Sequence, residues 1–178
     1  MKKLIAAFVG SMALASAPVA LGAEATKELK MAYDADPVTL DIHEQLSGGI
    51  LQLSHMTFDP LLRWTKDLGF EPRLAESWER IDENTMRFKL REGVKFHSGN
   101  ELTTADVKFT FDRLKQSQDF KAIFKPFSGI NIIDDYTFEL VTSEPYPLLL
   151  NTATYIFPFD SEFYTGQTED GKDKRAIL

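Results

Sequence analysis

The feature of this sequence that most constrains its fold is a strict alternation of polar and apolar residues from position 85 to position 90. A period of two residues is typical of a β-strand with one buried face. A polar turn at residues 82–84 separates this segment from an earlier one that leads from Trp78 to Ile81. The two segments are therefore predicted to form a half-buried antiparallel hairpin.

A capped amphipathic helix is predicted soon after this hairpin. The chain first passes through a third short strand at residues 94–96 and a turn at residues 99–100. Thr103 and Asp106 then have the spacing of a helix capping box. Phe109 points away from the main apolar face, so the helix is expected to bury two sides or to leave one side against something else. That main face consists of Val107, Phe111 and Leu114.

Two flanking regions extend the predicted sheet. Residues 61–64 have the composition of a strand. Trp64 could face a ligand or be a cross-strand partner, but it is interpreted as a core residue. Residues 130–133 and 137–141 form a second predicted hairpin around a polar turn. From Ser161 onward the composition becomes polar and charged, which is typical of a surface linker.

Three motifs in the central region resemble the signature of the extracytoplasmic solute-binding proteins of family 5, the peptide- and nickel-type receptors of ABC importers. The motifs are LAESWE at residues 74–79, LREGVKFHSG at residues 90–99 and LTTADVKFTFDRL at residues 102–114. The likeness extends more weakly from Leu29 to about Tyr164. It implies an α/β class with an α+β lobe, in a periplasmic-binding-protein-like class II fold.

The resemblance also implies a division of the chain. Residues 1–23 are expected to be a signal peptide, and residues 24–60 the N-terminal strand and helix of lobe I. Residues 61–160 are expected to form most of the second, scaffold domain of mixed sheet and helices, and residues 161–178 a linker at the truncation point. Members of the family are far longer, so the chain is expected to be an amino-terminal fragment of a binding protein.

The amino terminus has the pattern of a secretory leader. Lys2 and Lys3 precede an apolar core at residues 4–14, and small residues follow through Ala23 and Ala25. Cleavage is predicted after Ala23 or Ala25, whereas an uncleaved anchor is disfavoured because the apolar run is short and interrupted. No cysteine is present to carry a lipid. The protein is therefore expected to be exported to the periplasm and not to be a lipoprotein.

Composition excludes several classes of function. The formal net charge is −7, and removal of the leader with its two lysines makes it more negative, so nucleic acid is not an expected partner. The sequence contains no cysteine, which excludes a disulfide framework and thiol chemistry. The stability of the domain is expected to come from its apolar core alone.

The best candidate for a ligand contact is the glycine-containing start of a predicted helix. Leu46, Ser47, Gly48 and Gly49 precede an apolar-periodic run, and backbone N–H groups at such a start suit an anion such as a peptide carboxylate. The resemblance implies that this loop lies at the cleft between lobes. The alternative is that Ser47 only caps the helix and the glycines only allow the turn.

A second candidate follows from the resemblance alone. It implies that an aromatic side chain from the region after the capped helix reaches the cleft, and Phe124 is the candidate for it. The alternative is that Phe124 and its aromatic neighbours form satellite core.

Catalysis and metal binding are not expected. The carboxylates of the first hairpin lie on a strand and its turn, where charged side chains are usually solvated. The three histidines are far apart in sequence and form no i, i+4 ligand pair, and no nucleophile elbow or phosphate-binding loop is present. The carboxylates are Glu76, Glu79, Asp82 and Glu83, and the histidines are His43, His55 and His97.

The resemblance implies the function of a substrate-binding component of an ABC importer, with peptides as the leading solute. Two lobes would close around the solute and then dock on the permease subunits at the inner membrane. The receptor would be a monomer when full length, would need no cofactor, and would leave ATP to a separate subunit. Nickel chelates and oligosaccharides stay open as solutes. A small exported scaffold or protein-interaction domain is the alternative from another class.

Overall fold

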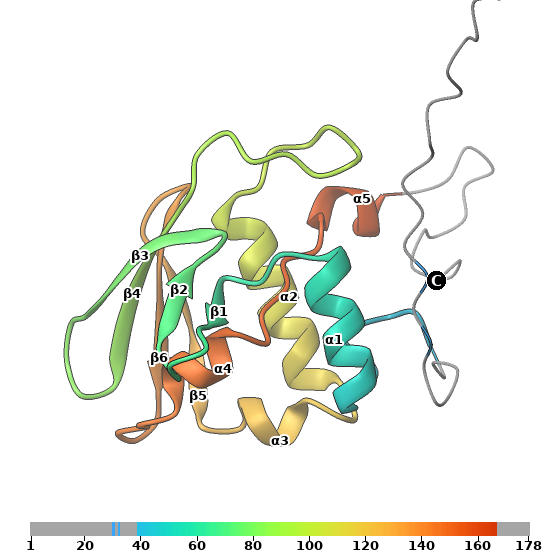
Figure 1. The fold of residues 1–178 in the computed structure, drawn as a ribbon. Helices are drawn as coiled ribbons and strands as arrows, with labels where there is room; N and C mark the ends of the chain where they lie inside the picture. Colours follow the sequence, from blue (N-terminus) through green and yellow to red (C-terminus); the bar gives the residue numbers. More distant parts are fainter. Residues whose placement is uncertain (1–29, 31, 33–38, 167–178) are drawn as a thin grey trace, which may run out of the picture. The chain divides into compact units, whose positions relative to one another are not determined.

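The computed structural model describes residues 30, 32 and 39–166. The chain separates into two compact units, Met1–Ala32 and Tyr33–Leu178, and the fold below is that of the second. The predicted signal peptide and most of residues 24–38, the start of the predicted lobe I segment, lie outside the described residues. The elements in chain order are α1 (Gly48–Thr57), β1 (Leu62–Trp64), β2 (Phe70–Pro72), β3 (Ala75–Arg80), β4 (Thr85–Leu90), α2 (Thr104–Gln116), α3 (Lys121–Phe124), β5 (Phe127–Ile132), β6 (Thr137–Thr142), α4 (Leu149–Ala153) and α5 (Ser161–Thr165) (Figure 1).

A four-stranded antiparallel sheet organises the described region. Its strand order is β3-β4-β6-β5, so the two predicted hairpins are confirmed and lie side by side, with β4 and β6 at the centre. Phe88 of β4 is directly opposite Phe138 of β6, and their rings stack with centroids 5.3 Å apart. The β1–β2 hairpin forms a separate two-stranded sheet.

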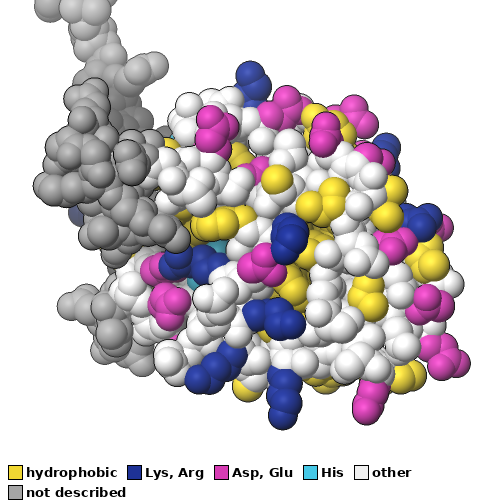
Figure 2. Space-filling model, turned by 180° about the vertical axis from the view of Figure 1, so that it is seen from behind, with side chains coloured by type: hydrophobic (Ala, Val, Ile, Leu, Met, Phe, Trp, Pro, Cys, Tyr) yellow, Lys and Arg dark blue, Asp and Glu magenta, His cyan; other side chains and the backbone are white. Residues whose placement is uncertain are grey.

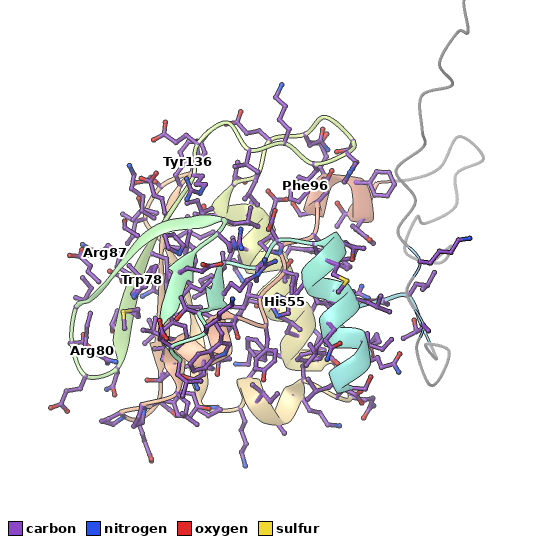
Figure 3. The ribbon with its side chains drawn as sticks, viewed as in Figure 1. His55, Trp78, Arg80, Arg87, Phe96 and Tyr136 are labelled. Atoms are coloured by element: carbon purple, nitrogen blue, oxygen red, sulfur yellow. The ribbon has the colours of Figure 1, made fainter. Side chains whose placement is uncertain are left out.

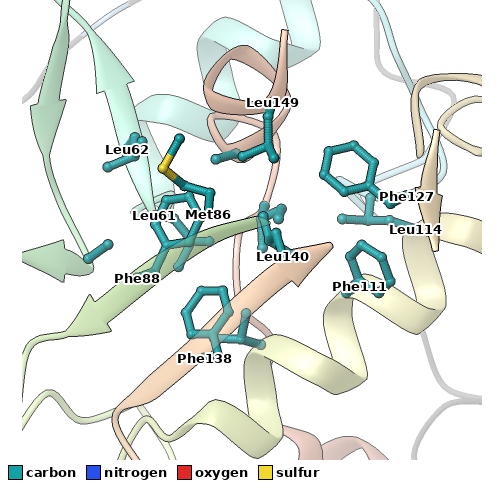
Figure 4. Close-up of a cluster of buried hydrophobic side chains, with 14 of the residues drawn as sticks. Leu61, Leu62, Met86, Phe88, Phe111, Leu114, Phe127, Phe138, Leu140 and Leu149 are labelled. Atoms are coloured by element: carbon teal, nitrogen blue, oxygen red, sulfur yellow. The ribbon is translucent and has the colours of Figure 1, made fainter. Parts of the chain in front are cut away.

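Along β4, apolar and charged side chains alternate between the two faces of the sheet. Met86, Phe88 and Leu90 are buried, whereas Arg87 and Lys89 lie on the opposite face. Side chains from α2 and α4 join the apolar face of the sheet in one core cluster (Figure 4). The predicted inward face of α2 is confirmed, because Val107, Phe111 and Leu114 are all buried in that cluster.

The capping box at the start of α2 is also confirmed. The backbone N–H of Thr103 donates to Asp106 Oδ2 at 2.8 Å, and the helix begins at the next residue. Phe109 lies on a second, partly buried side of α2 and contacts Tyr164 of α5, with ring centroids 6.4 Å apart. The helix therefore buries two sides, as its sequence predicts.

Three local predictions are wrong in detail. Residues 94–96 do not form a strand; a single bridge pairs Lys95 with Glu101 instead. Trp64 is not core, since it is 39% exposed and packs across the hairpin on Phe70, with ring centroids 4.5 Å apart. Within the predicted linker, Ser161–Thr165 is the helix α5, because Asp160 caps its first turn through a hydrogen bond from the Phe163 N–H at 2.8 Å.

Candidate functional site

Four of the predicted ligand-contacting residues come together at the start of α1. Ser47 is the N-cap residue, and its Oγ accepts a long hydrogen bond of 3.4 Å from the Ile50 N–H. Gly48 has open space where a Cβ would be, and no positive φ occurs at this turn. Ser47 therefore caps the helix, as the alternative interpretation of the sequence expected. Ser47 and Gly48 are nevertheless exposed, so the loop is accessible to a ligand.

A carboxylate from the same chain already contacts this loop. The Leu46 N–H donates to Asp119 Oδ2 at 2.8 Å, although the two residues are 73 positions apart. Asp119 is an exposed residue of the segment between α2 and α3. The loop therefore binds a carboxylate through its main chain, and an external carboxylate would compete with Asp119 for the Leu46 N–H.

The structure places Phe124 elsewhere, in the core. Its side chain is fully buried, and its ring centroid lies 5.8 Å from that of Phe111 and 5.8 Å from that of Phe127. A ligand on the surface of this structure cannot reach it. The prediction that Phe124 contacts a ligand is corrected accordingly: the aromatic residues after α2 form core, because they close the end of the sheet against the helix.

The segment before α1 is fixed by a buried histidine. His43 is fully buried, its ring lies 4.1 Å from that of Phe159, and its Nε2 lies 3.0 Å from the Phe157 carbonyl oxygen. A carbonyl can only accept, so Nε2 carries the proton and donates. Burial lowers the pKa of His43 to about 4, and the bond to the Phe157 carbonyl opposes this shift only partly. The imidazole is neutral at neutral pH and positions the loop.

An ion pair reinforces this attachment. The Asp41 carboxylate accepts from the Arg113 guanidinium of α2, and its other oxygen accepts from the His43 N–H at 3.0 Å. Arg113 also lies over the ring of Phe159, 5.6 Å from the centroid. The loop that leads to Leu46 is therefore fixed to both α2 and the 157–159 segment, which sets the direction of the exposed N–H groups.

A cavity that the sequence did not predict lies near the C-terminal end of α1. Its volume is about 370 Å³, and it is bounded by α5, by the Phe96 loop and by Phe58, which follows α1. Figure 3 labels Phe96 on this loop. Phe58 and Phe163 are 39% and 41% exposed there. The spacing of aromatic residues between positions 157 and 164 is the only local signal for it. The lining residues are Phe58, Phe96, His97, Ser98, Pro158, Phe159, Asp160, Phe163 and Tyr164.

Asp160 gives this cavity one charged group. Burial raises the pKa of its carboxyl, but hydrogen bonds from Ser98, the Phe163 N–H and Asn100 outweigh burial and hold that pKa below its usual value. The carboxylate is therefore ionised at neutral pH. Its hydrogen bonds connect the loop before α2 to the start of α5 and so form one wall of the cavity.

The carboxylates of the first hairpin are engaged in ordinary surface interactions. Glu76 contacts Lys89 at 2.8 Å and Glu79 contacts Arg87 at 3.3 Å, while Asp82 Oδ1 accepts from the Asn84 N–H in the turn. On the face seen in Figure 2, acidic and basic side chains are interspersed. These carboxylates therefore form a solvated charged surface, which is the arrangement that the sequence favoured over a catalytic pair.

Two further properties concern only the described part of the chain. Within it, His, Asp and Glu side chains form no group of three or more that could hold a metal ion. Among the same residues, the helices are too short or too polar to cross a membrane.

Comparison with known proteins gives consistent results. AmiA of Streptococcus pneumoniae, an oligopeptide-binding protein, is 26% identical over an alignment of 193 positions, gaps included, which covers 94% of this chain and 29% of AmiA. GsiB of Escherichia coli K12, a glutathione-binding protein, is 26% identical over 149 residues, which cover 82% of this chain and 29% of GsiB. This chain thus spans less than a third of the length of either relative.

A solved structure and a family comparison extend this likeness. The crystal structure of NikA from Brucella suis in complex with Fe(III)-EDTA superimposes with a TM-score of 0.58 at 29% identity, over 68% of this chain and 26% of NikA. This likeness confirms the predicted fold class. The family described as bacterial extracellular solute-binding proteins, family 5 Middle, matches residues 69–177. Because that match covers more than half of the sequence, the chain belongs to the bacterial extracellular solute-binding proteins of family 5.

Proposed function

We propose that this chain forms part of the substrate-binding component of an ABC importer for peptides. The family match carries the general proposal. The choice of peptides is supported by two relatives, since AmiA is an oligopeptide-binding protein and GsiB binds glutathione, which is itself a short peptide. NikA in its complex with Fe(III)-EDTA supports metal chelates as the competing solute class.

The proposed mechanism is reversible closure of two lobes around the solute, followed by docking of the closed receptor on the permease subunits. No bond is broken in the solute, and ATP is hydrolysed by a different subunit. The leader would direct export to the periplasm and would be removed after Ala23 or Ala25. Residues 61–160 would then serve as the scaffold domain that flanks the binding lobes.

The loop at residues 46–49 is the proposed point of contact with the peptide. Its support is the bond from the Leu46 N–H to Asp119, which provides a carboxylate acceptor where a peptide carboxylate would bind. Asp119 is exposed and can move away without opening the core. A peptide carboxylate would replace it and accept from the same main-chain group.

A hybrid receptor provides the test. The mature part of this chain would replace the aligned part of AmiA, and the thermal midpoint would be measured with an oligopeptide, with glutathione and with a nickel–histidine chelate. A ligand that binds only the folded state must raise the midpoint. We expect a rise with peptides in the hybrid and none with this chain alone.

Two outcomes would contradict the proposal. A hybrid that unfolds cooperatively but responds to no peptide would remove the receptor function from this chain. A hybrid that responds only to the nickel chelate would leave the receptor function intact and replace peptides as the solute class. Mass spectrometry of the exported chain, with an expected N-terminus at Glu24 or Thr26, tests the localisation separately.

The exposed aromatic cavity favours a second candidate function, a small exported domain that binds another protein. Exposed apolar surface of this kind is common at protein interfaces. This alternative predicts a cooperative unfolding transition and a stable monomer for the chain alone. The receptor proposal predicts instead that a solute is bound by the hybrid and not by this chain alone.

A further inference from the structure

The helix α1 has an outer face that is open among the described residues. Ser54 is the one residue of this helix that is fully buried. A step of two residues along an α-helix turns the side chain by roughly 200°, so Met56 lies on the side of α1 opposite Ser54. Met56 is 61% exposed, and Leu53, about one turn before it, is half-buried. The helix makes only sparse contacts with the other described helices and strands, and Figure 1 shows it at the side of the fold away from the four-stranded sheet.

The sequence of α1 does not suit a helix that faces water. Residues 45–58 contain no Asp, Glu, Lys or Arg, although 26% of the residues in the whole chain are charged. A surface helix normally carries charged or polar side chains on its solvent side. The outer face of α1, which we define by Leu53 and Met56, carries apolar side chains instead. Its composition is therefore that of a face that packs against other apolar side chains.

This apolar surface continues into the aromatic cavity. Phe58 follows α1 and lines the cavity, and its ring centroid lies 6.1 Å from that of Phe159. Phe163 of α5, which is also partly exposed, lines the same cavity. A continuous apolar surface of this kind usually marks an interaction site.

The relatives indicate what covers this surface. The aligned region takes up only 29% of AmiA and 29% of GsiB, so more than two thirds of each relative lies outside it. The helix α5 ends at its C-cap, Gly166, so the chain that follows this helix starts close to the cavity that α5 lines. Permanent interfaces are more apolar than transient ones. An apolar surface at this place therefore fits the interior of a larger protein better than a site for a transient partner.

The charge at the cavity is consistent with an apolar partner surface. The Asp160 carboxylate already accepts hydrogen bonds from Ser98, from Asn100 and from the Phe163 N–H. A partner surface therefore has no need to supply a positive charge opposite it.

We propose that the outer face of α1 and the adjoining aromatic cavity pack, in a full-length receptor, against an apolar surface of the part that relatives such as AmiA carry outside the aligned region. This contact lies within one receptor molecule and therefore needs no second copy of the chain. The inference rests on the proposed function, because it takes the chain as part of a receptor, but it requires no particular solute. It also explains why α1 is apolar on the side away from Ser54.

Oxidation of methionine measures whether the outer face is covered. Hydrogen peroxide converts an accessible methionine to its sulfoxide, and Met86, which is buried, is the protected reference in the same protein. The protein is the hybrid of this chain with AmiA, without solute and with Leu68→Met at an 80% exposed turn position as the accessible reference. In the hybrid we expect Met56 to lose its reactivity and to oxidise as slowly as Met86, while the methionine introduced by Leu68→Met reacts fast. Mass spectrometry of the peptides follows each site separately.

A charge on the outer face provides a second measurement. Met56→Glu should lower the thermal midpoint of the hybrid, because it would bury a carboxylate without a partner, whereas Met56→Leu should leave the midpoint nearly unchanged. In this chain alone, Met56→Glu should have little effect, because the side chain is exposed there. Leu68→Glu is the matched control for a surface carboxylate and should change the midpoint of neither protein.

Several outcomes would overturn the proposal. Fast oxidation of Met56 in a hybrid whose Met86 is protected would show that the outer face stays open in the receptor and is free for another protein. Protection of Met56 that disappears on dilution would assign the cover to a second copy. An equal effect of Met56→Glu in the hybrid and in this chain alone would assign it to residues of this chain.

The test also separates this inference from the proposed function. A hybrid in which Met86 reacts as well would show that the AmiA part does not complete this chain, which counts against the proposed contact. No readout involves a solute. A folded hybrid that protects Met56 but binds no peptide would therefore contradict the proposed function and leave the contact in place.

Discussion

Asp106 and Ser161 are joined by two hydrogen bonds, since Asp106 Oδ1 accepts from both the backbone N–H of Ser161 at 2.8 Å and its hydroxyl at 2.7 Å. The other oxygen of the same carboxylate caps α2 through Thr103. One buried side chain therefore fixes the start of α2 and the start of α5 relative to each other. It also sets the position of the wall that α5 contributes to the aromatic cavity.

The first prediction concerns this carboxylate. Asp106→Ala should lower the free energy of unfolding by about 2–4 kcal/mol, because it removes a helix cap and leaves the donors of Thr103 and Ser161 unpaired. Asp112→Ala is the control, since Asp112 only pairs with Lys108 on the exposed face of α2 and should cost about 0.5 kcal/mol or less. Urea unfolding measures both. Equal losses in the two variants would contradict this role of Asp106.

The second prediction is a dependence of stability on pH. The pKa of His43 is about 4 in the folded chain and 6.5 as its ordinary value, so the unfolded state binds more protons between these values. Stability is therefore fully present above pH 6.5 and declines as the pH falls toward 4, by at most about 3 kcal/mol from this group.

The variant His43→Gln isolates that contribution. Urea unfolding at pH 7.5 and pH 4.5 should show a smaller loss on acidification in the variant than in the unmodified chain. Arg113, Asp41 and Tyr164 lie at the same aromatic cluster, and so does His55, whose ring is 5.0 Å from that of Phe157 and whose pKa is also lowered by burial. All four are unchanged in the variant. An identical loss in both proteins would show that His43 does not carry the effect.

The third prediction separates core from surface among the aromatic residues. Phe124→Ala should lower the free energy of unfolding by about 3–5 kcal/mol, because it empties a fully buried site between Phe111 and Phe127. Phe163→Ala, at a side chain that is 41% exposed, should cost about 1 kcal/mol or less. If Phe124→Ala were as stable as the unmodified chain, the core assignment of Phe124 would fail.

The fourth prediction concerns the main-chain group at Leu46. Asp119→Ala should free the Leu46 N–H and leave stability nearly unchanged, because both partners lie at the surface. In amide NMR spectra, added acetate should then shift the Leu46 signal more strongly in the variant. Asp119→Asn keeps an acceptor oxygen and is the control with an intermediate response. A Leu46 signal that responds equally in all three proteins would argue against competition at this site.

Local patterns predicted the elements whose partners are close in sequence. The alternation at residues 85–90 and the pairing of Thr103 with Asp106 each specify structure within a few residues, and both the hairpin and the capped helix are present. Ser47 likewise caps α1 as its position suggests. Strand alternation and helix caps of this kind depend only on interactions between residues that are close in the sequence.

Features that depend on distant contacts were not predictable in the same way. His43 lies in a polar stretch, and only the aromatic segment at residues 157–159 makes it a buried residue. Phe124 was a ligand candidate from the family resemblance alone, and its burial comes from distant contacts with β5 and α2 together. The short helix α5 lies at the start of a polar and charged segment, yet its contact with Asp106 keeps it against α2.

The order of strands has a consequence for how the chain folds. Each hairpin closes over a short turn, but the central pairing of β4 with β6 joins residues such as Arg87 and Glu139, which are 52 positions apart. Contacts between distant residues form late because the intervening chain must lose its freedom first. We therefore expect the two hairpins to form first and α2 to dock on them later. The pairing of β4 with β6 in the middle of the sheet, and not the closure of the turns, then limits the rate of folding.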